Sequence, residues 1–398
     1  MQNGETITEL RKGLGWTQED FADKYGYLLQ GYPVRREAIK HMEKHGFPKD
    51  PMRRAIVATL LGIPLAAVGL EQTPLSLETL VLPTVKNGPI DLVEYHSALQ
   101  SYDRSLVGDG CDWRVALSDI LGRIQALHNK VLYAGAQKLE MVQLLCGFHV
   151  TVADIASEQR LQNTVESFNN AIILAREYKL PQHYAYTLFR RGIFFEHNGN
   201  TEAASRDFHQ ALRVKKKLPP QLKGLILSTA SRADSLCAEE SEDVDDALDL
   251  SDEAENFISD HVEEEAFLTR FDKDRWLLSR VAVRIGSPLR ACRHPDEALK
   301  ELAQVGLSDE SRLSAAREKE SIILQAKIKI DKGEYAFATK LASDVTVIMR
   351  EVQSYICVHD VEALYAALKE TNYGQSREVL KLGVDLLKVQ RPELFPVD

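Results

Sequence analysis

The sequence contains few cysteines, and their arrangement excludes two common kinds of stabilised site. They are Cys111, Cys146, Cys237, Cys292 and Cys357. Their number is odd, they lie far apart, and none stands in a CxxC motif, whereas zinc sites and disulfide frameworks need closely spaced or even-numbered sets. We therefore expect no disulfide bridge, no metal centre and no cofactor.

A long apolar run is also missing. No stretch reaches the roughly 18 consecutive apolar residues that are typical of a membrane-spanning helix. The chain does not open with the basic and then apolar segment of a secretory leader. We expect a cytoplasmic protein without a membrane partner.

Motifs of catalysis and nucleotide binding are absent from the sequence as well. There is no GxxxxGK[ST] phosphate loop, no GxGxxG after a strand, no HExxH motif and no GxSxG motif. The segment Gly108-Asp109-Gly110 predicts a turn and not a phosphate site. Four histidines in the central part of the chain could suggest a metal site: His149, His183, His197 and His209. They have no carboxylates at fixed offsets, so we interpret them as ordinary helix residues. The sequence does not indicate an enzyme.

The charge of the chain is divided unevenly. The whole sequence has a net charge of −10, but residues 1–70 have ten Lys and Arg against eight Asp and Glu, which leaves +2 there and −12 in the remainder. A local cationic surface, and not the total charge, decides DNA binding. Two short runs, the basic 213–217 and the acidic 239–246, are interpreted as solvated helix ends. The alternatives, a second nucleic-acid surface and a partner-binding edge, stay open.

What the sequence does contain at its N-terminus is a series of short amphipathic helices. The first is expected to end at Gly15. The second is expected to be capped by Thr17 and to end where Tyr25-Gly26 turns the chain. The apolar residues expected to face inward from these two helices are Ile7, Leu10, Leu14, Phe21 and Ala22.

A third helix is predicted from about Val34 to Lys44. Ala38, Ile39 and Met42 are expected to face inward. The outer face holds Arg35, Arg36, Glu37 and Lys40, with His41 near its edge. Such a helix can enter the major groove and offer Arg or Lys to guanine edges and phosphates. Further helices over residues 50–62 and 63–70 complete a five-helix domain.

These features resemble the Cro/phage-repressor class of helix-turn-helix domains, also called XRE, over roughly residues 4–70. The matching residues are Leu10-Arg11, Gly15-x-Thr17-Gln18-Glu19-x-Phe21-Ala22, Tyr25-Gly26 and Ile39-x-x-Met42-Glu43-x-x-Gly46. The resemblance implies double-stranded DNA as a partner, with Thr17 and Gln18 at the start of the second helix, where Gln18 contacts a phosphate. It places the base-reading residues on the third helix: Arg35, Arg36, Glu37 and Lys40.

The chain departs from this class between the second and third helices. Members of the class have one or two residues after the equivalent of Gly26, whereas here residues 27–33 intervene. The start of the third helix, and with it the base contacts, is therefore open. The alternative is a small helical protein-interaction domain without DNA binding.

The remainder of the chain is predicted to consist of helix pairs. Residues 71–90, with the proline-broken and strand-like run 80–85, are interpreted as a linker. Glycines and prolines divide residues 91–398 into seven pairs: 91–133, 137–178, 183–216, 219–258, 263–304, 310–351 and 354–389. A helical repeat array is a common way for an all-helical chain to reach this length. We predict an all-α fold, with the N-terminal five-helix helix-turn-helix domain followed by these pairs.

One helix pair has a specific pattern. Seven of its residues fall at positions 4, 8, 11, 15, 20, 24 and 27 of a 34-residue unit that begins at Ala185: Leu188, Gly192, Phe195, Gly199, Ala204, Phe208 and Ala211. This resembles a tetratricopeptide repeat (TPR), in which small residues let two antiparallel helices approach and aromatic rings fill the gap between them. Weaker matches lie at 333–341 and 161–178. The resemblance implies a right-handed TPR-like α-solenoid with a concave inner surface.

A helix-turn-helix domain followed by such a solenoid resembles the peptide-responsive bacterial regulators of the RRNPP group and related XRE–TPR regulators. The resemblance implies that the inner face binds a peptide or protein ligand and that C-terminal repeats form a homodimer. Inner-face positions 2, 5, 9 and 12 of the specific repeat hold the candidate ligand-binding residues Tyr186, Phe189, Ile193 and Glu196. The apolar residues available for a dimer interface in the last pair are Tyr355, Ile356, Leu364, Tyr365, Leu368, Leu380, Leu386 and Leu387.

The sequence therefore predicts a non-enzymatic, DNA-binding transcriptional regulator whose solenoid senses a peptide or protein ligand. The alternative comes from another class: a TPR adaptor or scaffold whose N-terminal domain contacts protein instead of DNA. The two differ in salt dependence, because a DNA reader loses affinity steeply as the salt concentration rises.

Overall fold

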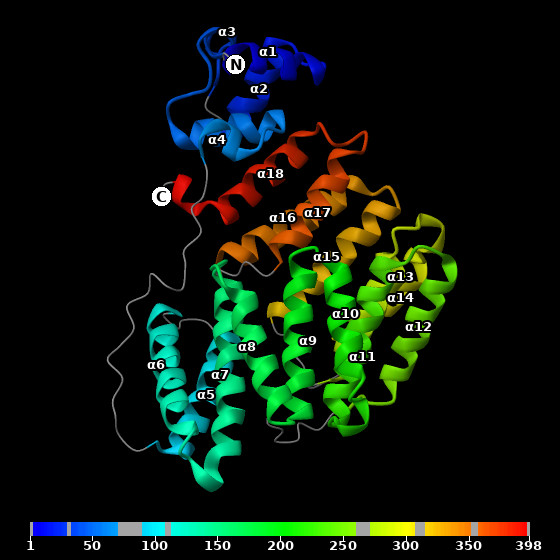
Figure 1. Ribbon diagram of the computed structural model, residues 1–398. Helices are drawn as coiled ribbons and strands as arrows, with labels where there is room; N and C mark the ends of the chain where they lie inside the picture. Colours follow the sequence, from blue (N-terminus) through cyan, green and yellow to red (C-terminus); the bar gives the residue numbers. More distant parts are fainter. Residues whose placement is uncertain are drawn as a thin grey trace. The chain divides into compact units, whose positions relative to one another are not determined.

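The computed structural model describes residues 3–29, 33–70, 90–107, 113–259, 271–306, 315–351 and 357–395, and every regular element in these ranges is helical (Figure 1). The all-α prediction is confirmed for them. The predicted linker up to residue 89, the run 80–85, the predicted turn 108–110 and Cys111 lie outside the described residues.

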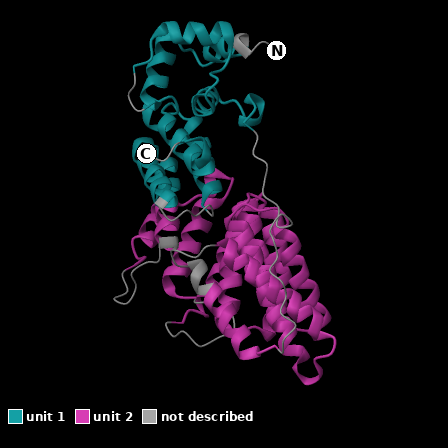
Figure 2. Cartoon of the chain, turned by 90° about the vertical axis from the view of Figure 1, so that its left-hand side faces the viewer, with its two compact units in different colours: residues 1–73, 325–398 teal, residues 74–324 magenta. Residues whose placement is uncertain are grey.

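The helices form two compact units (Figure 2). Residues 1–73 together with 325–398 make the first unit, and residues 74–324 make the second. The last helices of the chain therefore group with the N-terminal helices, although the sequence pattern had placed residues 91–398 together.

The N-terminal segment of the first unit contains four helices and a short 3-10 helix. They are α1 (Asn3–Gly13), α2 (Gln18–Leu28), α3 (Arg36–His45), α4 (Pro51–Leu61) and η1 (Leu65–Val68). Gly15 and Gly62, with φ of +72° and +69°, end α1 and α4 in the left-handed conformation that glycine adopts without strain. Thr17 and Asp50 cap the helices that follow them. These local signals explain why the predicted helices form where they do.

The predicted turn at Tyr25-Gly26 is wrong. Both residues lie inside α2, which continues to Leu28. Tyr25 is 4% exposed, and its ring lies 6.4 Å from that of Phe21, one turn earlier on the same helix. Burial of this side of α2 favours its continuation, so part of the 27–33 segment extends the helix.

The described residues of the seven predicted pairs hold fourteen α-helices. In the second unit these are α5 (Leu92–Val107), α6 (Trp113–Val131), η3 (Gly135–Gln137), α7 (Lys138–Glu158), α8 (Thr164–Glu177), α9 (Pro181–His197), α10 (Thr201–Leu212), η4 (Lys215–Lys217), α11 (Pro220–Cys237), α12 (Ser241–Glu255), α13 (Lys273–Gly286), η5 (Arg290–Cys292) and α14 (Pro295–Leu302). The helix α15 (Ala315–Asp331) continues from the second unit into the first, which also holds α16 (Tyr335–Glu351), α17 (Val358–Lys369), α18 (Arg377–Gln390) and η6 (Pro392–Leu394).

Consecutive helices of the second unit pack in a repeat-like arrangement. Within pairs, α7 packs on α8, α9 on α10, α11 on α12 and α13 on α14. Between pairs, α8 packs on α9, α10 on α11 and α12 on α13. The first helices of neighbouring pairs also meet, since α9 contacts both α7 and α11, and α11 contacts α13.

The pair α9–α10 shows the close approach expected from its sequence. A Cβ atom at Gly192 of α9 would lie 2.4 Å from Cε1 of Phe208 on α10, so only glycine fits there. Leu188, Ala204 and Phe208 are fully buried, and Gly199 makes the connecting turn with φ of +73°. Small residues and one large ring thus set the distance between these helices.

Among the described residues, one helix meets the length and composition criteria for crossing a membrane, although it is not an uninterrupted apolar run. It is the segment Gly135–Glu158, and 72% of its apolar window is buried inside the structure. Core helices of folded proteins meet the same criteria, and its residues Val142, Leu145 and Phe148 are fully buried in the core that α6, α7 and α8 share.

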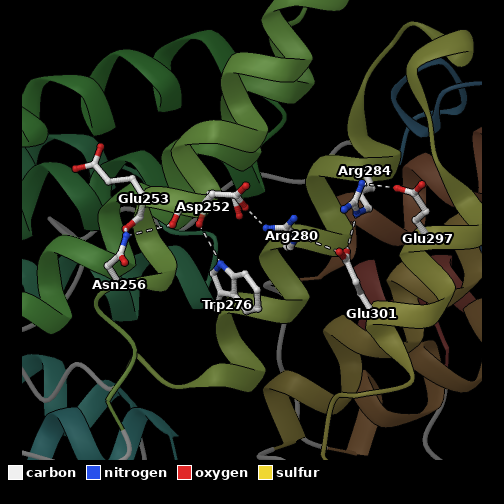
Figure 3. Close-up of polar contacts among 9 residues, drawn as sticks. Asp252, Glu253, Asn256, Trp276, Arg280, Arg284, Glu297 and Glu301 are labelled. Atoms are coloured by element: carbon white, nitrogen blue, oxygen red, sulfur yellow. Dashed lines mark hydrogen bonds and ion pairs between the residues drawn. The ribbon is translucent and has the colours of Figure 1, made fainter.

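An ion-pair chain joins α12, α13 and α14 (Figure 3). Glu301 of α14 accepts hydrogen bonds from Nε of Arg280 and Nε of Arg284 on α13, at 2.9 Å and 2.8 Å. Arg280 also pairs with Asp252 of α12, and its guanidinium lies 5.2 Å from the ring centroid of Trp276. The three side chains at the centre, those of both arginines and of Glu301, are at most 17% exposed. Ion pairs of this kind are less screened than surface pairs and help fix the three helices.

The buried His149 on α7 gives the first testable prediction. It is 9% exposed, and its ring lies 5.9 Å from the ring of His128. Burial, with a smaller contribution from the charge of His128, lowers the pKa of His149 to about 4. Below pH 6.5 the unfolded chain binds a proton here that the folded chain does not, so the free energy of unfolding should fall by about 2 kcal/mol between pH 7 and pH 5.

Urea unfolding of the wild type and of His149→Gln at pH 7, 6 and 5 measures this effect. The variant lacks the titrating group, so its unfolding free energy should fall by about 2 kcal/mol less than that of the wild type between pH 7 and pH 5. Equal pH dependence of both proteins would show that folding does not shift the pKa of His149.

The apolar residues of the last helix pair are covered within the chain. Five of them are at most 4% exposed: Leu364, Leu368, Leu380, Leu386 and Leu387. Leu380 and Leu387 pack into the cores of the N-terminal helices. The residues that the sequence assigned to a homodimer interface therefore present no such face where the structure describes them, and Tyr355 and Ile356 lie outside the described residues. The reason is that α18 is apolar on two sides and lies between α2 and α4 on one side and α16 and α17 on the other.

Candidate functional site

The exposed face of α3 carries four of the predicted DNA-contacting residues. Arg35, Arg36, Glu37 and Lys40 are all exposed, with Arg35 at the N-cap position. Ile39 and Met42 are buried, as predicted, whereas Ala38 is exposed and not inward-facing. The structure therefore gathers three cations and one carboxylate on the solvent side of a helix whose other side is fixed in the core.

A buried ion pair joins the inner side of α3 to α1. Nε of Arg11 on α1 lies 2.6 Å from Oε1 of Glu43 on α3, and the two side chains are 8% and 11% exposed. The other carboxylate oxygen of Glu43 accepts a hydrogen bond from the side-chain amide of Gln18, and Arg11 also donates to the backbone oxygen of Trp16. Glu43 thus ties α3 to α1 and to the start of α2.

Gln18 connects the buried ion pair to the exposed face. Its Oε1 accepts a hydrogen bond from Nε of Arg36 at 3.0 Å. Arg36 also lies 3.0 Å from Glu19, but both side chains are at least half exposed, and ion pairs of this kind contribute little stability. The network Arg11–Glu43–Gln18–Arg36 orients the guanidinium of Arg36. The sequence singled out Gln18 and Arg36 but not the role of Arg11 and Glu43, whose only signal was that both fall within the matched motif.

Thr17 has a structural role in α2. Its hydroxyl donates to Asp20 at 2.7 Å, and the backbone N–H of Thr17 donates to the same carboxylate at 2.8 Å. The backbone N–H of Asp20 in turn donates to the Thr17 hydroxyl, which completes a capping box. These hydrogen bonds, made by Thr17, lower the pKa of Asp20. The exposed end of α2 is therefore held in place beside α3.

One of the four predicted ligand-binding residues lies in the core. Phe189 is 1% exposed, and its ring centroid lies 6.4 Å from that of Tyr186 and 6.2 Å from that of Phe208. It fills the gap between α9 and α10, so it is a core residue and not a ligand contact. Ile193 packs half-buried on the same core. Glu196 is different, because its carboxylate lies 2.6 Å from Nε of Arg232 on α11.

Glu196 belongs to a larger set of charged residues that we call the first-helix cluster. Its members come from the first helices of five successive pairs, or from the N-cap of one of them: Asp154, Arg190, Glu196, Arg232, Asp272, Arg275, Arg317 and Glu320. Ion pairs join Asp154 to Arg190 at 2.9 Å, Arg232 to Glu320 at 2.8 Å and Asp272 to Arg317 at 2.8 Å. The side chains in these pairs and in Glu196–Arg232 are 8–36% exposed, so solvent reaches the cluster.

Arg275 shows how strongly the charges of this cluster interact. Burial lowers its pKa to about 10, and the charge of Glu320 offsets part of this effect. The charges of Arg317, Arg190 and Arg232 add to the lowering. Three guanidinium groups and the carboxylate of Glu320 therefore lie within electrostatic reach of Arg275. A polar ligand with both charged and hydrogen-bonding groups can exchange with these partners.

Comparison with known proteins does not place the chain in a family. No protein-family model, no curated protein and no solved structure gives a match. The chain is an all-helical protein with paired helices, and its function has to be argued from the two sites above. No group of three or more potential metal ligands occurs among the described residues.

Proposed function

We propose that the protein is a DNA-binding transcriptional regulator in which α3 reads double-stranded DNA and the helix pairs of the second unit sense a peptide or protein ligand. The observation that carries the proposal is the exposed face of α3. Arg35, Arg36 and Lys40 project from a short helix whose opposite side is fixed by Ile39, Met42 and the buried Arg11–Glu43 pair. Cations on a rigid helix are suited to phosphates and guanine edges in a major groove.

The ligand-sensing part of the proposal rests on the first-helix cluster. Its pairs bridge α7 to α9, α9 to α11, α11 to α15 and the start of α13 to α15. A peptide has carboxylate, ammonium and amide groups that can replace these partners. Because each pair joins two helices, replacement would change their spacing.

We also propose a homodimer, because a single reading helix covers only a few base pairs. Its interface must lie outside the buried residues of α17 and α18.

A binding selection followed by titration tests the DNA-reading function. Full-length protein is used to select duplexes from a random-sequence pool, and the affinity for the enriched duplex is measured by mobility shift. Lys40→Ala should weaken binding by about 1–3 kcal/mol, which corresponds to a roughly 5- to 150-fold loss of affinity. Lys300→Ala is the matched control, since it removes the same charge from an exposed position on α14.

Wild-type affinity should fall steeply when salt is raised from about 50 to 200 mM, with a smaller slope for Lys40→Ala. If no duplex is enriched, or if Lys40→Ala and Lys300→Ala bind as the wild type does, α3 is not a DNA reader. The adaptor function would then be the better explanation.

A further inference from the structure

The last long helix of the chain is built into the core of the N-terminal helices. Leu380 and Val384 of α18 are 2% exposed and belong to the hydrophobic core of α1, α2, α3 and α4. Leu387 packs with Ala55 and Ala58 of α4. The three α18 residues are spaced four and three apart and form one stripe along the helix. The N-terminal helices therefore complete their core with a segment from the other end of the sequence.

The side of α18 away from this stripe is covered by the helices that precede it. Leu382 and Leu386 are buried, and α18 packs on both α16 and α17. The fit to α17 is tight at Gly383, where a Cβ atom would lie 2.7 Å from the hydroxyl oxygen of Tyr365. Since packed layers do not deform continuously, a shift of α16 and α17 must either carry α18 along or separate it from α2 and α4.

The C-terminal end of the contact between α18 and the N-terminal helices is held by a buried hydrogen bond. Arg391, which follows α18, is 8% exposed, and its Nη1 donates a hydrogen bond to the backbone oxygen of Leu70 at 2.6 Å. Phe395 packs against the same small core. A charge-assisted hydrogen bond in a buried setting is costly to break.

The other end of the contact holds cations from three helices, and we call it the cationic edge. Nζ of Lys24 on α2 donates to the backbone oxygen of Gln375 at 2.7 Å, and the guanidinium of Arg377 lies 5.7 Å from the ring centroid of Tyr27 on α2. Burial lowers the pKa of Lys24, with Asp20 opposing and Arg377 adding to the effect. Burial and the charge of Lys24 likewise lower the pKa of Lys369 at the end of α17. The hydrogen bond of Lys24 is exposed, unlike that of Arg391, and repulsion among the cations offsets part of the stabilisation at this end.

We propose that α18 is a releasable clamp on helices α1–α4, anchored at Arg391 and opening at the cationic edge. In the closed state α18 fixes α2 and α4, and through them the support of α3. Movement of α16 and α17 opens the clamp from the Lys24 end. The clamp gives the chain a physical route from its later helices to the candidate DNA-reading helix, and its opening can be measured without any DNA ligand.

Hydrogen–deuterium exchange of the full-length chain, read by mass spectrometry, tests the clamp. Val384→Asp places a charge in the buried stripe of α18 and should raise exchange several-fold in α2, α4 and α18, with α7–α11 unchanged. Lys24→Gln removes one repelling charge but keeps a hydrogen-bond donor, so it should slow exchange in the same helices. Lys12→Gln is the matched control, because Lys12 is an exposed residue of α1.

Salt gives an independent measurement. Raising ionic strength from about 50 to 300 mM screens exposed like charges, so it should slow exchange of α2 and α18 in the wild type and change Lys24→Gln less. If Val384→Asp unfolds the whole chain, the exchange rates of Lys24→Gln and the response to salt test the clamp instead. Exchange in Lys24→Gln equal to the wild type, with the same response to salt, would overturn the clamp. So would unchanged exchange of α2 and α4 in Val384→Asp.

Discussion

Replacing Glu43 with alanine should destabilise the N-terminal helices by about 3–5 kcal/mol, because it leaves the charge of Arg11 buried without its partner. The side chain of Arg11 is 8% exposed, and its Nε lies 2.6 Å from the Glu43 carboxylate. The same substitution removes the group that holds Gln18, so the guanidinium of Arg36 also loses its support. The measurement is hydrogen exchange in α1, α2 and α3 of the full-length chain, together with its urea unfolding curve.

Glu37→Ala is the matched control for this prediction. Glu37 is exposed on the same helix, so loss of its charge should change stability by no more than about 0.5 kcal/mol. Glu43→Gln should lie between the two, since the amide can still accept a hydrogen bond from Arg11. Equal stability of Glu43→Ala and Glu37→Ala would mean that the buried pair contributes nothing to the position of α3.

Replacing Phe208 with alanine should destabilise the second unit by about 3–5 kcal/mol, because its fully buried ring fills the space between α9 and α10. The ring lies directly against Gly192, so Gly192→Ala should also destabilise, by about 1–3 kcal/mol through overpacking. Thermal unfolding followed by circular dichroism measures both effects.

The double variant Gly192→Ala/Phe208→Leu, compared with Gly192→Ala and Phe208→Leu alone, tests whether the two residues act through one contact. The smaller side chain makes room for the new methyl group, so the double variant should be more stable than the sum of the single effects predicts. Phe337→Ala is the matched control at a 42% exposed phenylalanine of α16 and should have little effect. Additive effects in the double variant would place Gly192 and Phe208 in separate contacts.

The positions of most helices could be predicted from the sequence, because helix capping and helix termination depend on residues close in the sequence. Gly15 and Gly62 end helices through their own backbone conformations, and Thr17 and Asp50 cap helices through atoms three residues away. The close approach at Gly192 was also predictable, since both helices of that pair lie within one short stretch of sequence. The turn expected at Tyr25-Gly26 failed because burial of Tyr25, which is a tertiary effect, overrode the local turn signal.

The residues of the candidate sites could be predicted only in part from the sequence. Helical periodicity predicts the exposure of Arg35, Arg36 and Lys40, because Ile39 and Met42 mark the inner side of α3. The first-helix cluster could not be predicted from the sequence, because Asp154, Arg232 and Glu320 come from separate helices and no local spacing relates them. Phe189 was misassigned as a ligand contact because repeat position alone does not show which side chain the neighbouring helix covers.

The sequence by itself determined most of the helix ends and which face of α3 is charged, because backbone capping and amphipathic periodicity act over a few residues. Only the tertiary structure decided that Arg11 and Glu43 share a buried ion pair and that α18 completes the core of α1–α4. The contact of Arg391 with Leu70 joins residues 321 positions apart. An apolar stripe such as that of Leu380, Val384 and Leu387 shows that a helix must be covered, but burial of apolar surface is non-directional, so the stripe does not specify what covers it.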